Sequence, residues 1–245
     1  MNEASKPIVS LIIPAYNEEK RIGKSLEQIL CFCNAQDYPY EVLVVDDGST
    51  DDTVAFVRRR FGDVQQLRIF PQPERRGKGA AVQQGMLQGG GEYLFFSDAD
   101  LSVPIEALPA FLAELKNNAA IAISSRRAPG AVIEIHQPYL RELMGRIFTA
   151  LSNLVLGLRH SDATCGFKGF RRDIARELFT RQRLHNWSFD CELLYLAALK
   201  GYRVSEIPVT WRNDRATKVR LWKDVIASFL GLLSIRKNHL LGKYR

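Results

Sequence analysis

Short apolar runs alternate with helical patterns through the first half of the sequence, and this alternation restricts the fold more than any other feature. The runs are rich in β-branched and aromatic residues, which is typical of buried strands. They cover residues 8–13, 41–45, 66–70, 93–97 and 120–124. Helical patterns lie between them, near residues 19–33, 51–61, 78–88 and 105–116. Apolar strands separated by helices indicate an α/β fold with a mostly parallel sheet covered on both faces.

The second half continues with longer helical patterns and fewer strands. It predicts helices over 139–158, 173–180, 190–200 and 219–241, and strands over 167–171 and 204–209. There is no internal repeat and no linker-like stretch. We therefore expect one domain over residues 1–215. Residues 216–245 would add a basic amphipathic helix as a C-terminal elaboration.

Charge and cysteine usage narrow the classes of partner. The net charge of +7 lies in the second half, where residues 129–245 carry 20 Lys and Arg against 10 Asp and Glu. This imbalance predicts an anionic partner. No helix-turn-helix or RNA-recognition signature accompanies it, so we do not expect nucleic acid. Four cysteines without paired spacing argue against a zinc site or a disulfide scaffold and indicate reduced thiols in the cytoplasm. No signal peptide and no membrane-spanning segment is predicted.

Polar side chains follow three of the predicted strands at the sheet edge where ligands bind in such folds. These strand ends are residues 14–18, 46–51 and 98–100. In the last of them, Asp98 and Asp100 fall on the same side of an extended backbone. Such a pair suits one hard divalent cation. The alternative is that the pair only caps the helix that Pro104 opens.

Two further segments have both a structural and a functional interpretation. After the second strand, Ser49 or Thr50 can cap the next helix, which leaves Asp46 and Asp47 to bind ribose hydroxyls or a base edge. Residues 75–81 match neither a P-loop nor a dinucleotide-binding glycine motif. Their glycines fit a tight turn into a helix, and their cations fit a phosphate.

Taken together, these motifs resemble the family-2 glycosyltransferases, which have the Rossmann-like GT-A fold. The resemblance rests on residues 12–19, 44–51, 77–79 and 98–100, which occur in family order. It implies that the first two segments hold the nucleoside of a sugar nucleotide. It also implies that Asp98 and Asp100 bind a metal on the diphosphate. The residues that it assigns to the donor are Pro14, Ala15, Tyr16, Glu18, Asp46, Asp47, Lys78, Asp98, Ala99 and Asp100.

Segments of the second half resemble the dolichyl-phosphate β-glucosyltransferases and their mannosyltransferase kin. These segments are 125–126, 137–141, 162–168, 187–194 and 206–211. The resemblance implies inverting transfer of a hexose from a sugar nucleotide, UDP-glucose first, with Mg²⁺ or Mn²⁺. The acceptor would be a polyprenyl or dolichyl monophosphate.

An ionised lipid phosphate needs cations rather than a general base. The cations expected to bind the acceptor phosphate are Arg126, Arg141 and Lys168, and Trp187 is a further residue expected to bind the acceptor. The catalytic residues expected are Asp100, Asp190 and Arg126. If the acceptor is a saccharide hydroxyl, Asp190 becomes the leading base. The sequence also leaves open GDP-mannose as the donor, and a membrane-surface binding protein without activity.

A lipid acceptor requires access to a membrane. The helix predicted over 219–241 has one apolar face with basic residues around it, which fits either the surface of an anionic bilayer or the protein core. The apolar face comprises Trp222, Val225, Ile226, Phe229, Leu230 and Leu233. The basic residues are Arg220, Lys223, Arg236, Lys237, Lys243 and Arg245. We expect a peripheral protein on the cytoplasmic face of a membrane, and the oligomeric state stays open.

Overall fold

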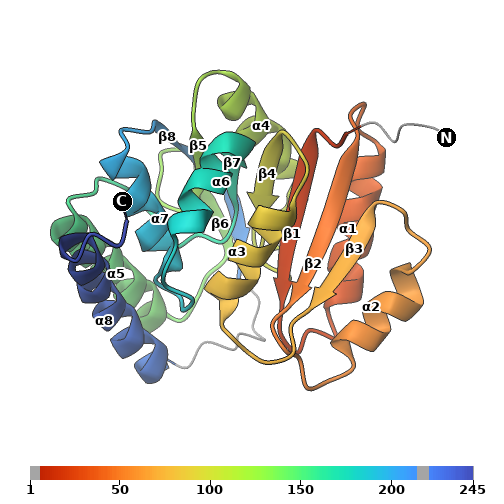
Figure 1. Cartoon of the computed structure of the whole chain (residues 1–245), viewed down its shortest axis with the longest axis horizontal. Coiled ribbons are helices and arrows are strands. Elements are labelled where there is room, and N and C mark those ends of the chain that lie inside the picture. Colours follow the sequence, from red (N-terminus) through yellow and green to blue (C-terminus); the bar gives the residue numbers. More distant parts are fainter. Residues whose placement is uncertain (1–5, 214–220, 245) are drawn as a thin grey trace.

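A seven-stranded sheet forms the centre of the molecule (Figure 1). The computed structural model describes residues 6–213 and 221–244, the second range with its side chains from residue 227 onward. The strand order is β3-β2-β1-β4-β7-β5-β8, and every neighbouring pair is parallel except the two that involve β7. The strands are β1 Val9–Ala15, β2 Tyr40–Asp46, β3 Leu67–Pro71, β4 Tyr93–Phe96, β5 Ile121–Ser125, β7 Lys168–Arg171 and β8 Val204–Pro208. The predicted α/β fold with a mostly parallel sheet is confirmed.

Helices cover both faces of this sheet, which explains why its strands are apolar throughout. On β1, Leu11 and Ile13 pack against one helical layer, while Ile12 packs against the other. The first layer contains α1 Ile22–Asn34, α2 Thr53–Phe61 and α4 Leu108–Lys116, which follows the short 3₁₀ helix η1 Ile105–Ala107. The second contains α3 Lys78–Gln88, α6 Arg172–Arg181 and α7 Phe189–Leu199, with α3 and α6 in front of the sheet in Figure 1.

Two helices extend the second layer beyond α7, and a small sheet packs against the core of the first layer through Ile133 and Trp211. Helices α5 (Tyr139–Leu156) and α8 (Leu221–Leu240) lie side by side (Figure 1). Strands β6 (Val132–Ile135) and β9 (Thr210–Arg212) pair in parallel. The sequence did not predict these two strands, because they are short and β6 is largely exposed, so they lack the apolar pattern of a buried strand.

Helix α8 packs on the core through its second half. Leu232 and Ile235 are buried, and Gly231 lies so close to Ser188 that a Cβ built there would be 2.1 Å from its Oγ. Only glycine permits this approach. The predicted boundary near residue 215 falls outside the described residues. So do the side chains of Arg220, Trp222, Lys223, Val225, Ile226 and Arg245. Within the described ranges, no helix has the length and apolar character needed to cross a bilayer.

Candidate active site

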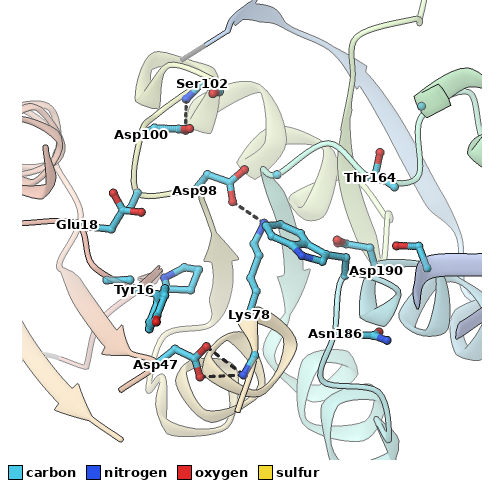
Figure 2. A pocket seen from close by; sticks show the side chains of 18 of the residues that line it. Tyr16, Glu18, Asp47, Lys78, Asp98, Asp100, Ser102, Thr164, Asn186 and Asp190 are labelled. Atoms are coloured by element: carbon cyan, nitrogen blue, oxygen red, sulfur yellow. Dashed lines mark hydrogen bonds and ion pairs between the residues drawn. The ribbon is translucent and has the colours of Figure 1, made fainter. Parts of the chain in front are cut away.

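A cavity of about 650 Å³ opens where β1, β2 and β4 end, and it brings together most of the residues that the sequence singled out. The far wall comes from α5, α7 and α8, so segments from both halves of the chain meet here. Figure 2 shows part of the lining. The predicted residues that line the cavity are Pro14, Ala15, Tyr16, Glu18, Asp47, Lys78, Asp98, Ala99, Asp100, Arg126, Arg141, Trp187 and Asp190. Two predicted residues, Asp46 and Lys168, do not line it.

Asp47 fixes the turn that leads into α3. Its carboxylate accepts hydrogen bonds from the backbone N–H of Arg76 at 2.8 Å and of Gly77 at 2.9 Å. Figure 2 shows the Asp47 carboxylate at this turn. Burial raises the pKa of Asp47, and these backbone hydrogen bonds oppose that rise. Gly77 has φ +107°, and a Cβ there would lie 2.5 Å from the carbonyl oxygen of His185. The turn therefore requires glycine at position 77, and the adjacent residues Arg76 and Lys78 line the cavity.

Asp46 has a structural role in place of the predicted nucleoside contact. It is 2 % exposed and accepts hydrogen bonds from Ser49, from the backbone N–H at 3.0 Å and from the hydroxyl. This pairing closes the turn after β2 and keeps the Asp46 carboxylate out of the cavity. The predicted cap by Ser49 or Thr50 is also corrected, because Asp51 Oδ1 accepts from the N–H of Thr53 at 3.0 Å where α2 begins.

Lys78 extends from the first turn of α3 to Asp98 (Figure 2). Its Nζ lies 2.5 Å from Asp98 Oδ1 and 5.2 Å from the centre of the Trp187 ring system. Burial by itself would lower the pKa of Lys78, but the negative charges of Asp98 and Asp190 outweigh it and raise the pKa. Lys78 is therefore a cation inside the cavity.

Asp100 lies two residues beyond Asp98 on a strained turn. Its Oδ1 accepts a hydrogen bond from the backbone N–H of Ser102 at 3.0 Å, and Leu101 between them has φ +49°, a region that residues other than glycine rarely adopt. Burial raises the pKa of Asp100, and the charge of Asp98 adds to this effect. The turn thus holds two carboxylates close enough to repel each other.

This pair fits a divalent metal that binds together with a phosphate. Among the described residues, no three or more His, Cys, Asp or Glu side chains gather as a complete metal site. Mg²⁺ is commonly held by one or two carboxylates plus substrate phosphates. Asp98 and Asp100, which both line the cavity, match that incomplete set of protein ligands.

Arg126 also lines the cavity, and a buried carboxylate orients it. Asp162 is 0 % exposed and accepts from Arg126 at two points, Nε at 2.6 Å and Nη2 at 2.9 Å. Burial acts to raise the pKa of Asp162, but the charge and hydrogen bonds of Arg126 prevail and lower it to about 2. The guanidinium also lies 5.4 Å from the centre of the Trp211 ring system. Arg141 on α5 lines the same region, and burial together with the charge of Arg126 lowers its pKa.

Lys168 supports Asp190 and does not reach the cavity. It is 1 % exposed, and its Nζ lies 2.7 Å from Asp190 Oδ1 and 2.6 Å from the carbonyl oxygen of Cys165. The expectation that Lys168 binds an acceptor phosphate directly is therefore corrected. Its ammonium neutralises Asp190, which lines the cavity from α7.

Comparison with known proteins agrees with this arrangement. The model of the glycosyl transferase family 2 matches residues 10–179, more than half of the chain. The chain belongs to this family. It is therefore a glycosyltransferase, as the sequence motifs predicted.

The relatives and the solved structure that match this chain cover nearly all of it. Dolichyl-phosphate β-glucosyltransferases of Drosophila melanogaster, Saccharomyces cerevisiae and Homo sapiens are 34%, 33% and 32% identical to it. Each match covers 97% of this chain and 76–77% of the relative. Glucosyl-3-phosphoglycerate synthase of Mycobacterium tuberculosis, solved with Mn²⁺, UDP-glucose and phosphoglyceric acid, superposes with a TM-score of 0.71 at 20% identity. That match covers 95% of this chain and 80% of the synthase, and it confirms the GT-A fold.

Several residues of this glycosyltransferase cavity were not assigned to it from the sequence. Ala227 and Ser228 on α8 line the cavity because Gly231 allows this helix to pack closely against Ser188. Small neutral side chains such as these give no sign in the sequence that they line a site. Trp211 belongs to the segment 206–211 that resembles the dolichyl-phosphate β-glucosyltransferases, but its position beside Arg126 depends on the fold. The other unassigned lining residues include Arg21, Met144, Phe148, Asn186 and Asn213.

Glu192 anchors the segment that carries Trp187. This carboxylate is 0 % exposed and accepts hydrogen bonds from the N–H of Arg183 at 3.0 Å, the N–H of Leu184 at 2.8 Å and the Tyr244 hydroxyl at 2.6 Å. Burial raises the pKa of Glu192, and these hydrogen bonds oppose that rise.

Tyr244→Phe is expected to lower the free energy of unfolding by about 2 kcal/mol, because it removes a hydrogen bond to a buried carboxylate. Urea unfolding followed by circular dichroism measures this loss. Tyr40→Phe is the matched control, since the Tyr40 hydroxyl donates to Asn34 at 2.6 Å on the surface and should contribute less than about 1 kcal/mol. Equal losses in the two variants would contradict an anchoring role for Tyr244.

Proposed function

We propose that this glycosyltransferase moves a glucosyl residue from UDP-glucose to a dolichyl or polyprenyl monophosphate in a single inverting displacement. The observation that carries the proposal is that one cavity is lined both by two carboxylates, Asp98 and Asp100, and by two arginines, Arg126 and Arg141. We call the first pair the acidic wall and the second pair the basic wall. The relatives named as dolichyl-phosphate β-glucosyltransferases support the choice of sugar and acceptor. The mycobacterial synthase bound to Mn²⁺ and UDP-glucose supports the class of donor.

The acidic wall would hold the donor. Asp98 and Asp100 would bind Mg²⁺ or Mn²⁺ together with the diphosphate, and the metal would supply Lewis-acid stabilisation of the departing nucleotide. Tyr16 and Asp47, at the ends of β1 and β2, would contact the nucleoside. Asp190, paired with Lys168 at 2.7 Å, would accept hydrogen bonds from the hydroxyls of the sugar.

The basic wall would hold the acceptor. Asp162 engages Arg126 through Nε and Nη2, so the Nη1 side of the guanidinium is left to bind the lipid phosphate. Arg141 would add a second cation to the same phosphate. A phosphate monoester is already an anionic nucleophile, and these two arginines would orient its oxygen toward the anomeric carbon.

The outer surface of α5 and α8 would rest on a membrane. Phe148 and Phe229 pack together between the two helices with ring centroids 5.7 Å apart. Exposed apolar side chains gather on these helices and just beyond them, which is a surface that an interfacial protein presents to lipid. They are Tyr139, Leu140, Leu143, Ile147, Leu154, Leu230, Leu233, Leu240 and Leu241. Residues 1–215 would then form the catalytic domain, and residues 216–245 would contribute to a peripheral contact with the cytoplasmic face of a membrane.

The test is a transfer assay with the purified full chain, Mn²⁺ or Mg²⁺, and dolichyl phosphate in detergent. UDP-glucose is expected to give a glucosyl lipid that is identified by mass, and GDP-mannose is expected to give none. Chelation of the metal should stop the reaction. A mannosyl lipid, transfer to a free saccharide only, or no product from any donor would each overturn the proposal.

Asp100→Asn should reduce the rate of transfer roughly a hundredfold or more, because a metal ligand supplies several kcal/mol of stabilisation to the transition state. Single-time-point assays within the linear range measure this loss. The matched control is Asp63→Asn, an exposed residue that does not line the cavity, which should leave the rate unchanged. A fully active Asp100→Asn variant would remove the carboxylate pair from the proposed mechanism.

A further inference from the structure

We propose that Lys78 occupies the cation position at Asp98 while the donor is absent, so that the divalent metal binds tightly only together with the diphosphate. This inference rests on the proposed function, because it concerns the same metal and donor. It makes Lys78 a positioning residue that couples two binding events.

The ammonium of Lys78 already neutralises the carboxylate that the metal would use. Nζ lies 2.5 Å from Asp98 Oδ1, and the Lys78 side chain is only 14 % exposed whereas that of Asp98 is 35 % exposed. A metal ion that approached Oδ1 would meet this ammonium at close range. Two cations repel each other strongly in a poorly solvated site, so the metal must compete with Lys78.

The other oxygen of Asp98 offers little alternative. A Cβ built on Gly166 would lie 1.9 Å from Asp98 Oδ2, which means that the carboxylate is packed against the backbone of that glycine. Asp98 is thus confined between Lys78 on one side and Gly166 on the other. Rotation of the carboxylate away from Lys78 is restricted by this contact.

The backbone beneath Lys78 is fixed, so displacement involves only the side chain. Asp47 accepts hydrogen bonds from the N–H of Gly77. The N–H of Gly79 donates to the carbonyl oxygen of His185 at 2.8 Å. Between these two anchors, the four-carbon stem of Lys78 can swing while α3 stays in place.

A diphosphate gives the displaced ammonium a new partner. The Lys78 side chain lines the same cavity as Asp98 and Asp100, so a diphosphate on the metal would lie within its reach. The donor would therefore attract Lys78 away from Asp98 as it delivers its own oxygens to the metal. By linkage, the donor must raise the affinity for metal by the same factor by which the metal raises the affinity for donor.

The test measures Mn²⁺ binding directly, by electron paramagnetic resonance of free Mn²⁺, with and without UDP. Wild-type protein is expected to bind Mn²⁺ weakly alone and more tightly with UDP. Lys78→Met keeps the stem and removes the charge. We expect it to tighten the binding of Mn²⁺ alone by about tenfold and to reduce the gain caused by UDP, in the range typical of coupling between sites.

Three variants make the result specific. Arg75→Met removes a cation from the same cavity that stacks on Tyr16, 4.1 Å from its ring centre, and should leave the binding of Mn²⁺ alone, without UDP, unchanged. Lys78→Arg keeps the charge and should bind Mn²⁺ alone as weakly as wild type. If Lys78→Met binds Mn²⁺ no more tightly than wild type while Asp98→Asn still weakens the complex with UDP, the coupling is refuted and the proposed function stands. If Asp98→Asn has no effect on Mn²⁺ in any state, the metal site itself is wrong.

Discussion

Asp162→Asn is expected to destabilise the protein by about 3 kcal/mol, because it leaves the charge of Arg126 buried without its partner. It should also lower the rate of transfer by about a hundredfold, since Arg126 loses the two contacts, at 2.6 Å and 2.9 Å, that orient it. Urea unfolding and the transfer assay measure the two effects. Asp173→Asn is the control, because its ion pair with Arg171 is exposed and spans 3.6 Å. Exposed pairs contribute less than about 1 kcal/mol.

The pH dependence of the unfolding free energy provides a second test of the role of Asp162. The folded protein lowers the pKa of Asp162 to about 2 from its ordinary value of 3.8. A carboxyl group with a lowered pKa contributes stability that is complete above the unfolded value and is lost as the pH falls through the folded value. The difference in unfolding free energy between wild type and Asp162→Asn should therefore be constant at neutral pH and shrink below about pH 4. A difference that stays constant down to pH 2 would show that the ionised Asp162 is not its source.

Gly166→Ala is expected to reduce transfer by about a hundredfold while the protein stays folded. The new methyl group would lie 1.9 Å from Asp98 Oδ2 and would push the carboxylate out of position, and a shift of about 1 Å at a reacting centre has an effect of that size. Mn²⁺ binding in the presence of UDP should weaken in parallel. Circular dichroism and the transfer assay separate this effect from misfolding.

Gly90→Ala is the matched control for this substitution. A Cβ at Gly90 would meet nothing nearer than Glu41 Oε1 at 3.5 Å, so activity should be unchanged. Full activity of Gly166→Ala would mean that Asp98 does not need its present position. The role assigned to Asp98 in metal binding would then have to be abandoned.

The sheet and the acidic wall of the cavity could be predicted from the sequence, because both are local patterns. Apolar strands followed by helices define the parallel sheet, and the strand ends bring Asp47, Asp98 and Asp100 to one edge. The antiparallel strand β7 was expected as a strand, but its place between β4 and β5 depends on contacts between distant segments.

Other parts of the site could not be predicted, because they depend on what each side chain meets. Asp46 and Asp47 are adjacent residues of the same type. Asp46 accepts hydrogen bonds from Ser49, whereas Asp47 lines the cavity. Lys168 has the charge of an acceptor ligand, but burial beside Asp190 gives it a supporting role. The contribution of α8 to the wall follows from one close helix approach at Gly231.

The size of the cavity bears on which acceptors the enzyme can tell apart. A volume of about 650 Å³ is typical of sites for small molecules, and the sugar nucleotide and one phosphate group would fill most of it. If the acceptor is the proposed lipid phosphate, its prenyl chain would leave the cavity past α5 and α8. Every such lipid would present the same headgroup to Arg126. Acceptors that differ only in chain length would be distinguished by how they partition into the membrane, and hardly at all by how they fit the protein.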